Sequence, residues 1–331
     1  MTELIKENTS SPKYDFGGRL TAEFPSQVIV DITEVCNLAC IHCPHPEFKK
    51  SVHYSARYLE PELNVKIVDE VRDSGAGKTQ YIRYTSEGEP LVHPNGYDMI
   101  EYAVKNSGTY VTLTTNGTIM NENRTRRLLD SGVHMIDISI DAMTSKTYEK
   151  IRVRGNLDVT RKNVINLIEW VRKSASPTKV VVSFIEQPQN RHEVKDFQSY
   201  WTERGADSVV IRRLHSAAGA VANIANNMHA EQEGELRRPC VYPWERIILN
   251  PRGYLSFCPA DWVNAASVVD YRGTSLLKTW QGEFYRKLRE AHLSNNFSCH
   301  AFCGQCPDWK ATRWPSEGRG YADLIAEMKQ F

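Results

Sequence analysis

Short runs rich in β-branched and aromatic residues alternate, over the first two thirds of the chain, with longer segments whose apolar residues recur at helical spacing. The runs predict strands at 27–32, 80–84, 110–114, 135–140, 179–184 and 208–212, and the longer segments predict helices at 61–74, 97–105, 121–131, 159–173 and 193–204. Strand–helix–strand units cross over in a right-handed sense and give parallel sheets. We therefore expect an α/β fold, either a partial (βα)6 barrel or an open doubly wound sheet.

The alternation stops after Arg212. The next residues are rich in Ala, Asn and Glu, whereas residues 244–258 predict a hairpin around a Pro-Arg-Gly turn, followed by a helix at 276–293. A chain of 331 residues also exceeds the usual size of one domain. We predict an N-terminal extension at 1–26, a core domain at 27–216, a linker at 217–239 and a smaller domain at 240–331.

The eight cysteines fall into two groups, with three between Cys36 and Cys43, five between Cys240 and Cys306, and none from 44 to 239. The first residues lack the apolar core of a signal peptide, and no stretch reaches the roughly 20 apolar residues of a spanning helix. We therefore expect a cytoplasmic protein without a membrane partner. Disulfides do not persist in the cytoplasm, so close-set cysteines there indicate metal binding or catalysis.

Charge excludes a class of partners. The chain has 41 Lys and Arg against 40 Asp and Glu, so it has no long-range field that would hold nucleic acid or an acidic membrane. We expect a small or neutral substrate and no nucleic-acid partner.

The first cysteine group has the spacing C-x3-C-x2-C, formed by Cys36, Cys40 and Cys43, and directly follows the first predicted strand. Three thiolates can bind three irons of a [4Fe–4S] cube and leave the fourth iron open to a chelating ligand. A structural zinc site completed by His42 or His45 and three unconnected thiols are the alternatives. This spacing, at this position, resembles the radical S-adenosylmethionine (SAM) superfamily, in which the open iron binds the amino and carboxyl groups of SAM.

The resemblance implies a SAM site around this loop. Glu87-Gly88-Glu89-Pro90 is similar to the family's Gly-Gly-Glu-Pro segment, with Glu87 in place of the first glycine, and implies that Gly88 and Glu89 contact the ammonium group of SAM. His42 stands where the family more often has an aromatic residue beside the adenine.

Further residues of the implied SAM site follow later predicted strands. Asn116 and Ser139 lie at the ends of the third and fourth, and Ser139 is expected near the SAM carboxylate or ribose. Arg152 or Arg154 is expected to pair with that carboxylate. The alternatives are an ordinary Asn-Gly turn, a helix cap at Asp141 and solvated arginines.

Four of the later cysteines have the spacing C-x17-C-x44-C-x2-C, and four thiolates close a [4Fe–4S] cube. They resemble the Twitch domain, the half-sized relative of the SPASM domain, which implies one auxiliary cluster held by Cys240, Cys258, Cys303 and Cys306. A tetrahedral zinc site is the alternative. The fifth thiol, Cys299, is a candidate catalytic hydrogen donor, with an alternative ligand or an inert thiol as the other possibilities.

The resemblance implies a radical SAM oxidoreductase or epimerase. A 5′-deoxyadenosyl radical would take a hydrogen atom from a carbinol carbon, which becomes a ketone if the auxiliary cluster accepts an electron, or is epimerised if a thiol returns hydrogen. About 26 residues precede the first strand, so we expect a sugar-like small molecule in preference to a peptide or protein. The expected partner is a low-potential electron donor, such as a flavodoxin or ferredoxin. A non-catalytic zinc-binding protein is the alternative from another class.

Overall fold

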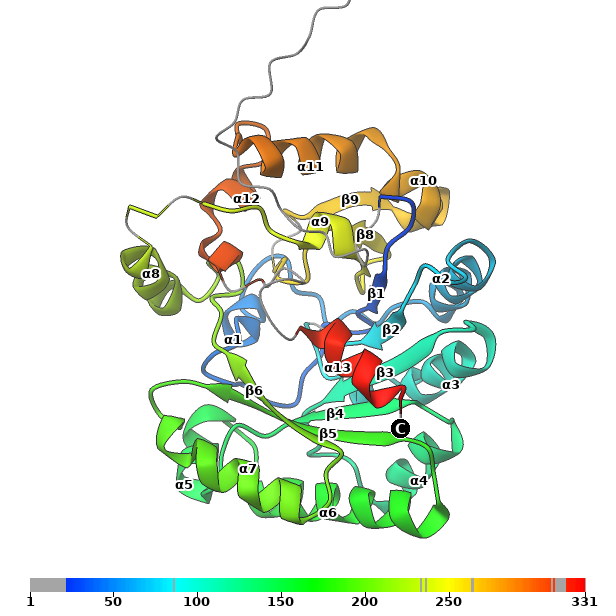
Figure 1. Cartoon of the computed structure of the whole chain (residues 1–331), viewed down its shortest axis with the longest axis vertical. Helices are drawn as coiled ribbons and strands as arrows, with labels where there is room; N and C mark the ends of the chain where they lie inside the picture. Colours follow the sequence, from blue (N-terminus) through cyan, green and yellow to red (C-terminus); the bar gives the residue numbers. More distant parts are fainter. Residues whose placement is uncertain are drawn as a thin grey trace, which may run out of the picture.

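One sheet runs through the part of the chain that the computed structural model describes, residues 22–85, 87–232, 234–235, 237–262, 265–310, 312 and 320–330. Its strand order is β6-β5-β4-β3-β2-β1-β7-β8-β9 (Figure 1). The strands are β1 Gln27–Val30, β2 Tyr81–Tyr84, β3 Tyr110–Thr115, β4 Met135–Ser139, β5 Lys179–Glu186, β6 Ser208–Arg213, β7 Arg246–Leu249, β8 Tyr254–Ser256 and β9 Ser267–Asp270. Of the predicted extension, residues 1–21 lie outside the described residues.

Helices follow most strands of the first two thirds. They are α1 His45–Phe48, α2 Pro61–Ser74, α3 Gly96–Asn106, α4 Glu122–Asp130, α5 Ser145–Ile151, α6 Leu157–Ser174 and α7 Val194–Glu203. The later helices are α8 Ala222–Glu231, α9 Tyr242–Glu245, α10 Leu276–Trp280, α11 Glu283–Ser294, α12 Ala301–Gln305 and α13 Tyr321–Met328.

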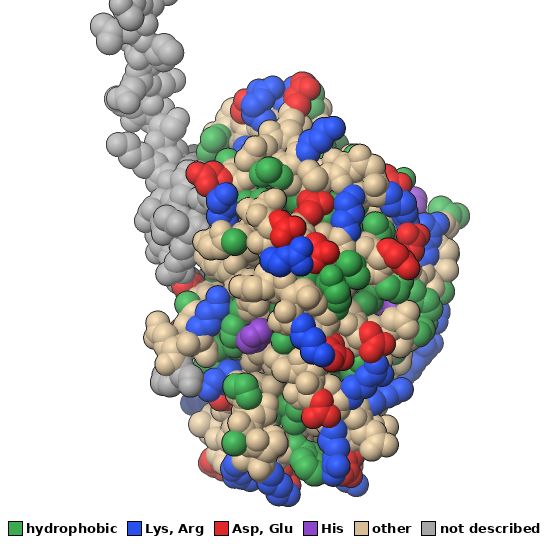
Figure 2. Space-filling view, turned by 90° about the vertical axis from the view of Figure 1, so that its right-hand side faces the viewer, with side chains coloured by type: hydrophobic (Ala, Val, Ile, Leu, Met, Phe, Trp, Pro, Cys, Tyr) green, Lys and Arg blue, Asp and Glu red, His purple; other side chains and the backbone are tan. Residues whose placement is uncertain are grey.

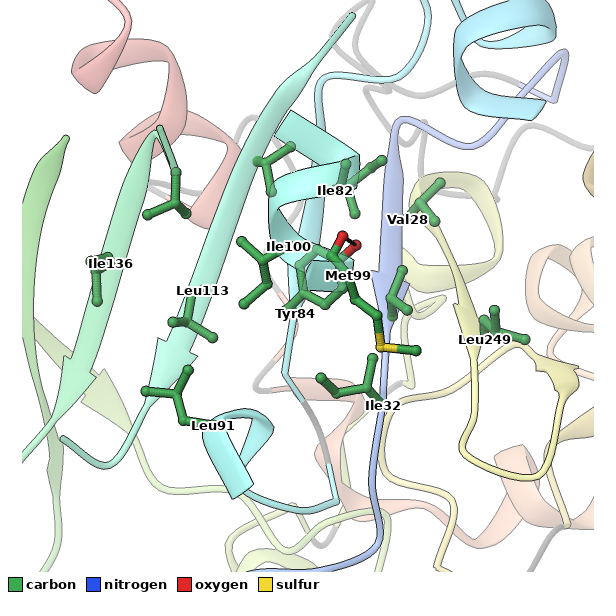
Figure 3. Packing of buried hydrophobic residues seen from close by; sticks show 14 of the residues in the cluster. Val28, Ile32, Ile82, Tyr84, Leu91, Met99, Ile100, Leu113, Ile136 and Leu249 are labelled. Atoms are coloured by element: carbon green, nitrogen blue, oxygen red, sulfur yellow. Dashed lines mark hydrogen bonds between the residues drawn. The ribbon is translucent and has the colours of Figure 1, made fainter. Parts of the chain in front are cut away.

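The six predicted core strands are confirmed, and β1 to β6 pair in parallel with their neighbours. Every second residue of these strands packs under the helices, because side chains alternate between the two faces of a strand. Figure 3 shows Val28, Ile82, Leu113 and Ile136 from four strands in this layer, with Ile100 of α3 against them. The opposite face is the concave, inner face of a partial barrel.

The part of the chain that contains the later cysteines continues the core sheet. Strand β7 pairs in parallel with β1, and β8 and β9 follow in antiparallel pairing. The predicted hairpin is therefore confirmed, with Gly253 at φ +82 in the turn between β7 and β8. The parallel contact with β1 was not predicted. The boundaries at 216/217 and 239/240 stay a prediction.

The helix predicted at 276–293 is wrong as one element. The structure has two helices, α10 and α11, that meet at Gly282, the N-cap of α11. A side chain at Gly282 would lie 2.9 Å from the backbone oxygen of Lys278, so the turn depends on glycine. Helix α8 occupies part of the predicted linker.

Helix α13, which was not predicted, covers the inner face of the barrel (Figure 1). Its residues Leu324, Ile325 and Met328 form a second buried cluster with Tyr81, Met135 and Val181 of β2, β4 and β5. The barrel is therefore closed by an apolar layer near the strands' N-terminal ends.

The surface in Figure 2 carries Lys and Arg side chains interspersed with Asp and Glu. This mixture agrees with the nearly balanced charge of the chain. Among the described residues, no helix has the length and apolar character needed to cross a membrane.

Candidate functional site

The first three cysteines lie on the loop that joins β1 to α1. Backbone bonds connect this loop to the end of α5, from Ala39 N–H to the Val153 carbonyl at 3.0 Å and from Ile41 N–H to the Ile151 carbonyl at 3.0 Å. Cys43 N–H also donates to the Cys40 carbonyl at 3.1 Å. The loop is therefore held at the C-terminal edge of the parallel strands, where α/β folds bind their ligands.

The three thiols of this loop share one buried environment. Burial, followed by the charge of Glu89, raises the pKa of Cys36 to about 12, and burial, followed by the charge of Cys40, raises that of Cys43 to about 12. Burial also raises the pKa of Cys40. Thiolates at these positions would repel one another, so they need a bound metal cation to stay ionised. This set of three thiols therefore fits an iron–sulfur cluster.

Arg152 lies beside this loop and is buried. It donates from Nε and Nη2 to Asp141 Oδ2 at 2.8 and 2.5 Å, and its Nη1 lies 3.8 Å from Cys40 Sγ. Asp141 has a left-handed backbone at φ +66 and also accepts from Ile185 N–H at 2.6 Å. The positive charge of Arg152 is thus held against the cysteine loop. Arg154 is exposed, at φ +74.

The segment after β2 packs directly on the cysteine loop. Glu89 N–H donates to the Val35 carbonyl at 2.9 Å. A Cβ on Gly88 would lie 2.3 Å from the Thr33 carbonyl oxygen and 2.5 Å from that of Val35, so only glycine permits this approach. Gly88 therefore fixes the distance between the two segments.

The Glu89 carboxylate is buried and connects the ends of β2 and β3. It accepts from Leu91 N–H at 3.2 Å, Thr115 Oγ1 at 2.7 Å and Asn116 N–H at 2.7 Å. Burial raises its pKa, although these three bonds favour the ionised form. The carboxylate thereby positions the backbone of Leu91 and Asn116 and the hydroxyl of Thr115.

Asn116 and His42 also lie at the cysteine loop. The side-chain amide of Asn116 donates to Asn37 Oδ1 at 2.9 Å, which connects the end of β3 to the loop. His42 Nε2 lies 3.8 Å from Asp141 Oδ2 and His42 Nδ1 lies 3.4 Å from Gln187 Nε2. Burial lowers the pKa of His42 to about 4, so its ring is neutral near pH 7.

The structure thus brings His42, Gly88, Glu89, Asn116 and Arg152 to the cysteine loop. Ser139 ends β4 at the same edge of the sheet and is half-buried. The contacts of these residues with SAM stay predictions.

Three acidic residues and one arginine of this region were not predicted. Arg252, in the turn after β7, donates from Nη1 to Glu34 Oε1 at 2.9 Å and from Nη2 to Glu87 Oε1 at 3.4 Å. Asp31 Oδ2 accepts from Glu87 N–H at 3.0 Å, and burial raises the pKa of Asp31 to about 8. Glu87 was a signal in the sequence, because it replaces a glycine of the family's segment. Its partner Arg252 lies 165 residues away.

The four later cysteines converge from separate segments. Cys240 precedes α9, Cys258 follows β8, Cys303 lies in α12 and Cys306 ends it. Burial, followed by neighbouring charges, raises the pKa of Cys306 to about 12 and that of Cys240, with burial dominant, to about 11. Charges on the other three cysteines also raise the pKa of Cys258, after burial. This mutual repulsion fits a second cluster site.

Cys299 differs from these four thiols. It is exposed, in the turn before α12, and its Sγ lies 3.9 Å from Ser298 Oγ. Its role as ligand, donor or inert thiol stays a prediction.

No group of three His, Cys, Asp or Glu side chains in the described part of the chain is arranged to hold one metal ion. In an iron–sulfur cube each cysteine binds a separate iron.

Comparison with known families gives two matches. A model described as "Radical SAM superfamily" matches residues 30–199, and one described as "Iron-sulfur cluster-binding domain" matches residues 240–307. A GTP 3′,8-cyclase of Desulforamulus reducens is 30% identical over 169 residues, which cover 51% of this chain and 49% of that protein. The chain spans about half the length of the curated relatives it matches.

Two solved structures share the fold. BtrN in complex with AdoMet and 2-DOIA gives a TM-score of 0.57 at 14% identity, over 85% of this chain and 92% of BtrN. Streptococcus suis SuiB bound to precursor peptide SuiA gives 0.64 at 16% identity, over 92% of this chain and 73% of SuiB. Such identities show similarity of fold alone.

Proposed function

This chain belongs to the radical SAM superfamily, and on that basis we propose that it abstracts a hydrogen atom from a carbinol carbon of a sugar-like small molecule and thereby dehydrogenates or epimerises it. The family match confirms the resemblance inferred from the cysteine spacing, and with the iron–sulfur domain it implies SAM, a [4Fe–4S] cluster and an auxiliary cluster. The substrate and the outcome are the parts that we propose.

The observation that carries the proposal is the polarity of the inner barrel face. Strands of a parallel sheet buried on both faces are usually apolar throughout. Here Arg83, Asp137, Ser139, Ser183 and Arg212 alternate with apolar residues that pack under the helices. A polar inner face suits a small molecule with many hydroxyl groups, because each buried hydroxyl needs a hydrogen-bond partner.

The two groups of cysteines would each bind one cluster. Cys36, Cys40 and Cys43 would hold the cluster that binds SAM, and Cys240, Cys258, Cys303 and Cys306 would hold the auxiliary cluster. When bound, SAM and its cluster supply a 5′-deoxyadenosyl radical, and the auxiliary cluster supplies an electron acceptor.

The protein's own residues would orient SAM. We propose that Arg152, a fixed positive charge beside Cys40, pairs with the SAM carboxylate, and that Ser139 contacts the carboxylate or ribose. The neutral ring of His42 would lie against the adenine. Gly88 and Glu89 would present backbone and carboxylate acceptors to the ammonium group.

The outcome depends on what the substrate radical loses or gains. A carbinol radical that gives up one electron and one proton becomes a ketone, and the product is two mass units lighter than the substrate. A radical that receives a hydrogen atom from a thiol on the opposite face becomes an epimer of unchanged mass, and the thiyl radical left behind would need one electron from the reductant and one proton to become a thiol again. Cys299 is the thiol that we propose for the second outcome.

Peptide modification is the second candidate, because SuiB, solved with a precursor peptide, matches 92% of this chain in fold. The two candidates separate in one assay, in which the reconstituted enzyme receives SAM, reductant and either a panel of sugars and aminocyclitols or a panel of peptides. Consumption of a sugar supports the proposal, and consumption of a peptide alone refutes the substrate class.

The radical chemistry has its own test. Anaerobically reconstituted protein should hold about eight irons and eight sulfides, as two [4Fe–4S] clusters require. Cys40→Ala should abolish 5′-deoxyadenosine formation, whereas Cys258→Ala, at the auxiliary set, should retain uncoupled cleavage. Stoichiometric zinc without iron uptake, or undiminished cleavage by Cys40→Ala, would contradict these cluster assignments.

A further inference from the structure

The inner face of the barrel is layered along the strands. Its first layer is the apolar one that α13 covers, with Tyr81, Met135, Val181 and Val210. Two residues further along each strand lie Arg83, Asp137, Ser183 and Arg212, and alternation places them on the same face. The charged layer therefore lies between the apolar floor and the edge that carries the cysteine loop.

The charged layer is one connected group. Arg212 Nη2 donates to Asp137 Oδ2 at 2.5 Å, and Arg83 Nη2 lies 3.6 Å from the same oxygen. Arg83 also donates from Nε and Nη2 to Thr114 Oγ1 at 3.0 and 2.9 Å. Ser183 donates to the other oxygen of Asp137. Two guanidinium groups thus share one carboxylate.

Tyr321 of α13 packs against the two arginines of the charged layer. Its ring centroid lies 3.7 Å from Cζ of Arg83 and 5.4 Å from Cζ of Arg212, so both cations contact the same aromatic ring. Its hydroxyl lies 3.4 Å from Thr112 Oγ1. The ring of Tyr321 limits how far the two arginines can move towards α13.

The layer keeps one positive charge and free donors. Asp137 is fully buried, whereas the Arg83 and Arg212 side chains are 16% and 27% exposed. One carboxylate neutralises one of the two guanidinium charges. Among the described residues, the hydrogen bonds of Arg212 use Nη2, while Nε and Nη1 donate to no acceptor. A guanidinium group with N–H donors that have no acceptor can bind the oxygens of a carboxylate or a phosphate.

We infer that Arg83 and Arg212 form a subsite inside the barrel that binds an anionic group of the substrate, a carboxylate or a phosphate. The inference rests on the proposed function, because it specifies the sugar-like substrate as a sugar acid or a sugar phosphate. The balanced charge of the whole chain does not oppose it, since the positive charge is local and partly shielded from water.

The test is anaerobic titration calorimetry on the reconstituted enzyme with SAM bound. The probes are inorganic phosphate, D-glucose 6-phosphate, D-glucuronate and, as the neutral control, D-glucose. The wild type should bind at least one anionic probe more tightly than glucose, and the phosphate and carboxylate probes distinguish the two chemistries. Arg83→Gln and Arg212→Gln should each weaken that binding about tenfold or more, as loss of a charge-assisted hydrogen bond requires.

Arg213→Gln is the matched control, because Arg213 is the next residue of β6, exposed and on the other face. It should bind the probes as the wild type does. Absence of anion binding, or equal binding by Arg212→Gln and wild type, overturns the inference. Formation of 5′-deoxyadenosine by the same preparations separates this failure from failure of the proposed chemistry, since SAM cleavage does not require the subsite.

Discussion

Arg252 makes the contacts whose loss should be most easily measured. Its side chain is 5% exposed and pairs with Glu34, two residues before Cys36, and with Glu87, one residue before Gly88. The replacement Arg252→Met keeps most of the side-chain volume and removes the charge. Both carboxyl groups then remain buried without their cation.

The size of the effect follows from what each carboxyl group can do. Removal of one partner from a buried ion pair costs about 3–5 kcal/mol. Burial holds the pKa of Glu87 well above its usual value, so Glu87 can bind a proton in place of Arg252. Glu34 keeps bonds from Ser55 N–H at 2.9 Å and Arg57 N–H at 3.1 Å. We therefore expect the lower end, about 3 kcal/mol, or roughly 6 °C in Tm.

Differential scanning calorimetry of the reconstituted protein measures this shift. Arg272→Met is the matched control, because Arg272 follows β9 and its ion pairs with Glu60 and Asp270 are about half exposed. Exposed pairs contribute about 1 kcal/mol or less, so the control should lose about 2 °C or less. A Tm for Arg252→Met as high as that of the control would refute the argument from burial.

Three further predictions concern single residues of the two cysteine regions. Burial raises the pKa of Asp31 from 3.8 to about 8. Between about pH 4 and pH 8 the folded protein therefore holds a proton that the unfolded chain has released. The free energy of unfolding falls by about 1.4 kcal/mol per pH unit over this range. Asp31→Asn should therefore flatten the decline in Tm between pH 6.5 and 8, and an unchanged slope argues against the raised pKa. Gly88→Ala should lower the iron content towards about four per chain, because its Cβ would lie 2.3 Å from the Thr33 carbonyl oxygen. The control Gly273→Ala has open space around its Cβ and should retain both clusters. Equal iron content in the two variants contradicts the packing argument. If Cys299 donates hydrogen, Cys299→Ala should keep about eight irons and still form 5′-deoxyadenosine, yet incorporate no solvent deuterium into product; a loss of about four irons identifies a ligand instead.

Sequence reasoning succeeded where the signal is local. Helix α2 was predicted with the bounds that the structure has, Pro61–Ser74, because a proline favoured at the first turn precedes a regular apolar spacing. The strands were predicted for the same reason, since each is a short run of neighbouring β-branched and aromatic residues. The cysteine loop follows β1 directly, so its position needed only the strand.

Contacts between distant segments could not be predicted. Glu34 and Arg252 are separated by 218 residues, and one sequence contains no signal that joins them. Strand β7 joins β1 across a similar separation. Arg83 and Asp137 did leave a trace, because each interrupts an apolar strand, but only the alternation of the folded sheet shows that they share the inner face with Arg212.

The parallel pairing of β7 with β1 affects how the protein can be divided. Residues Gln27 to Val30 are buried and pair with Arg246 to Leu249 along their whole length. A fragment that stopped before β7 would leave this row of backbone N–H and carbonyl groups without partners, on a strand that is almost entirely apolar. Such an edge is a template for pairing with another molecule, so a truncated core would be prone to self-association and would be a poor substitute for the full chain in solution studies.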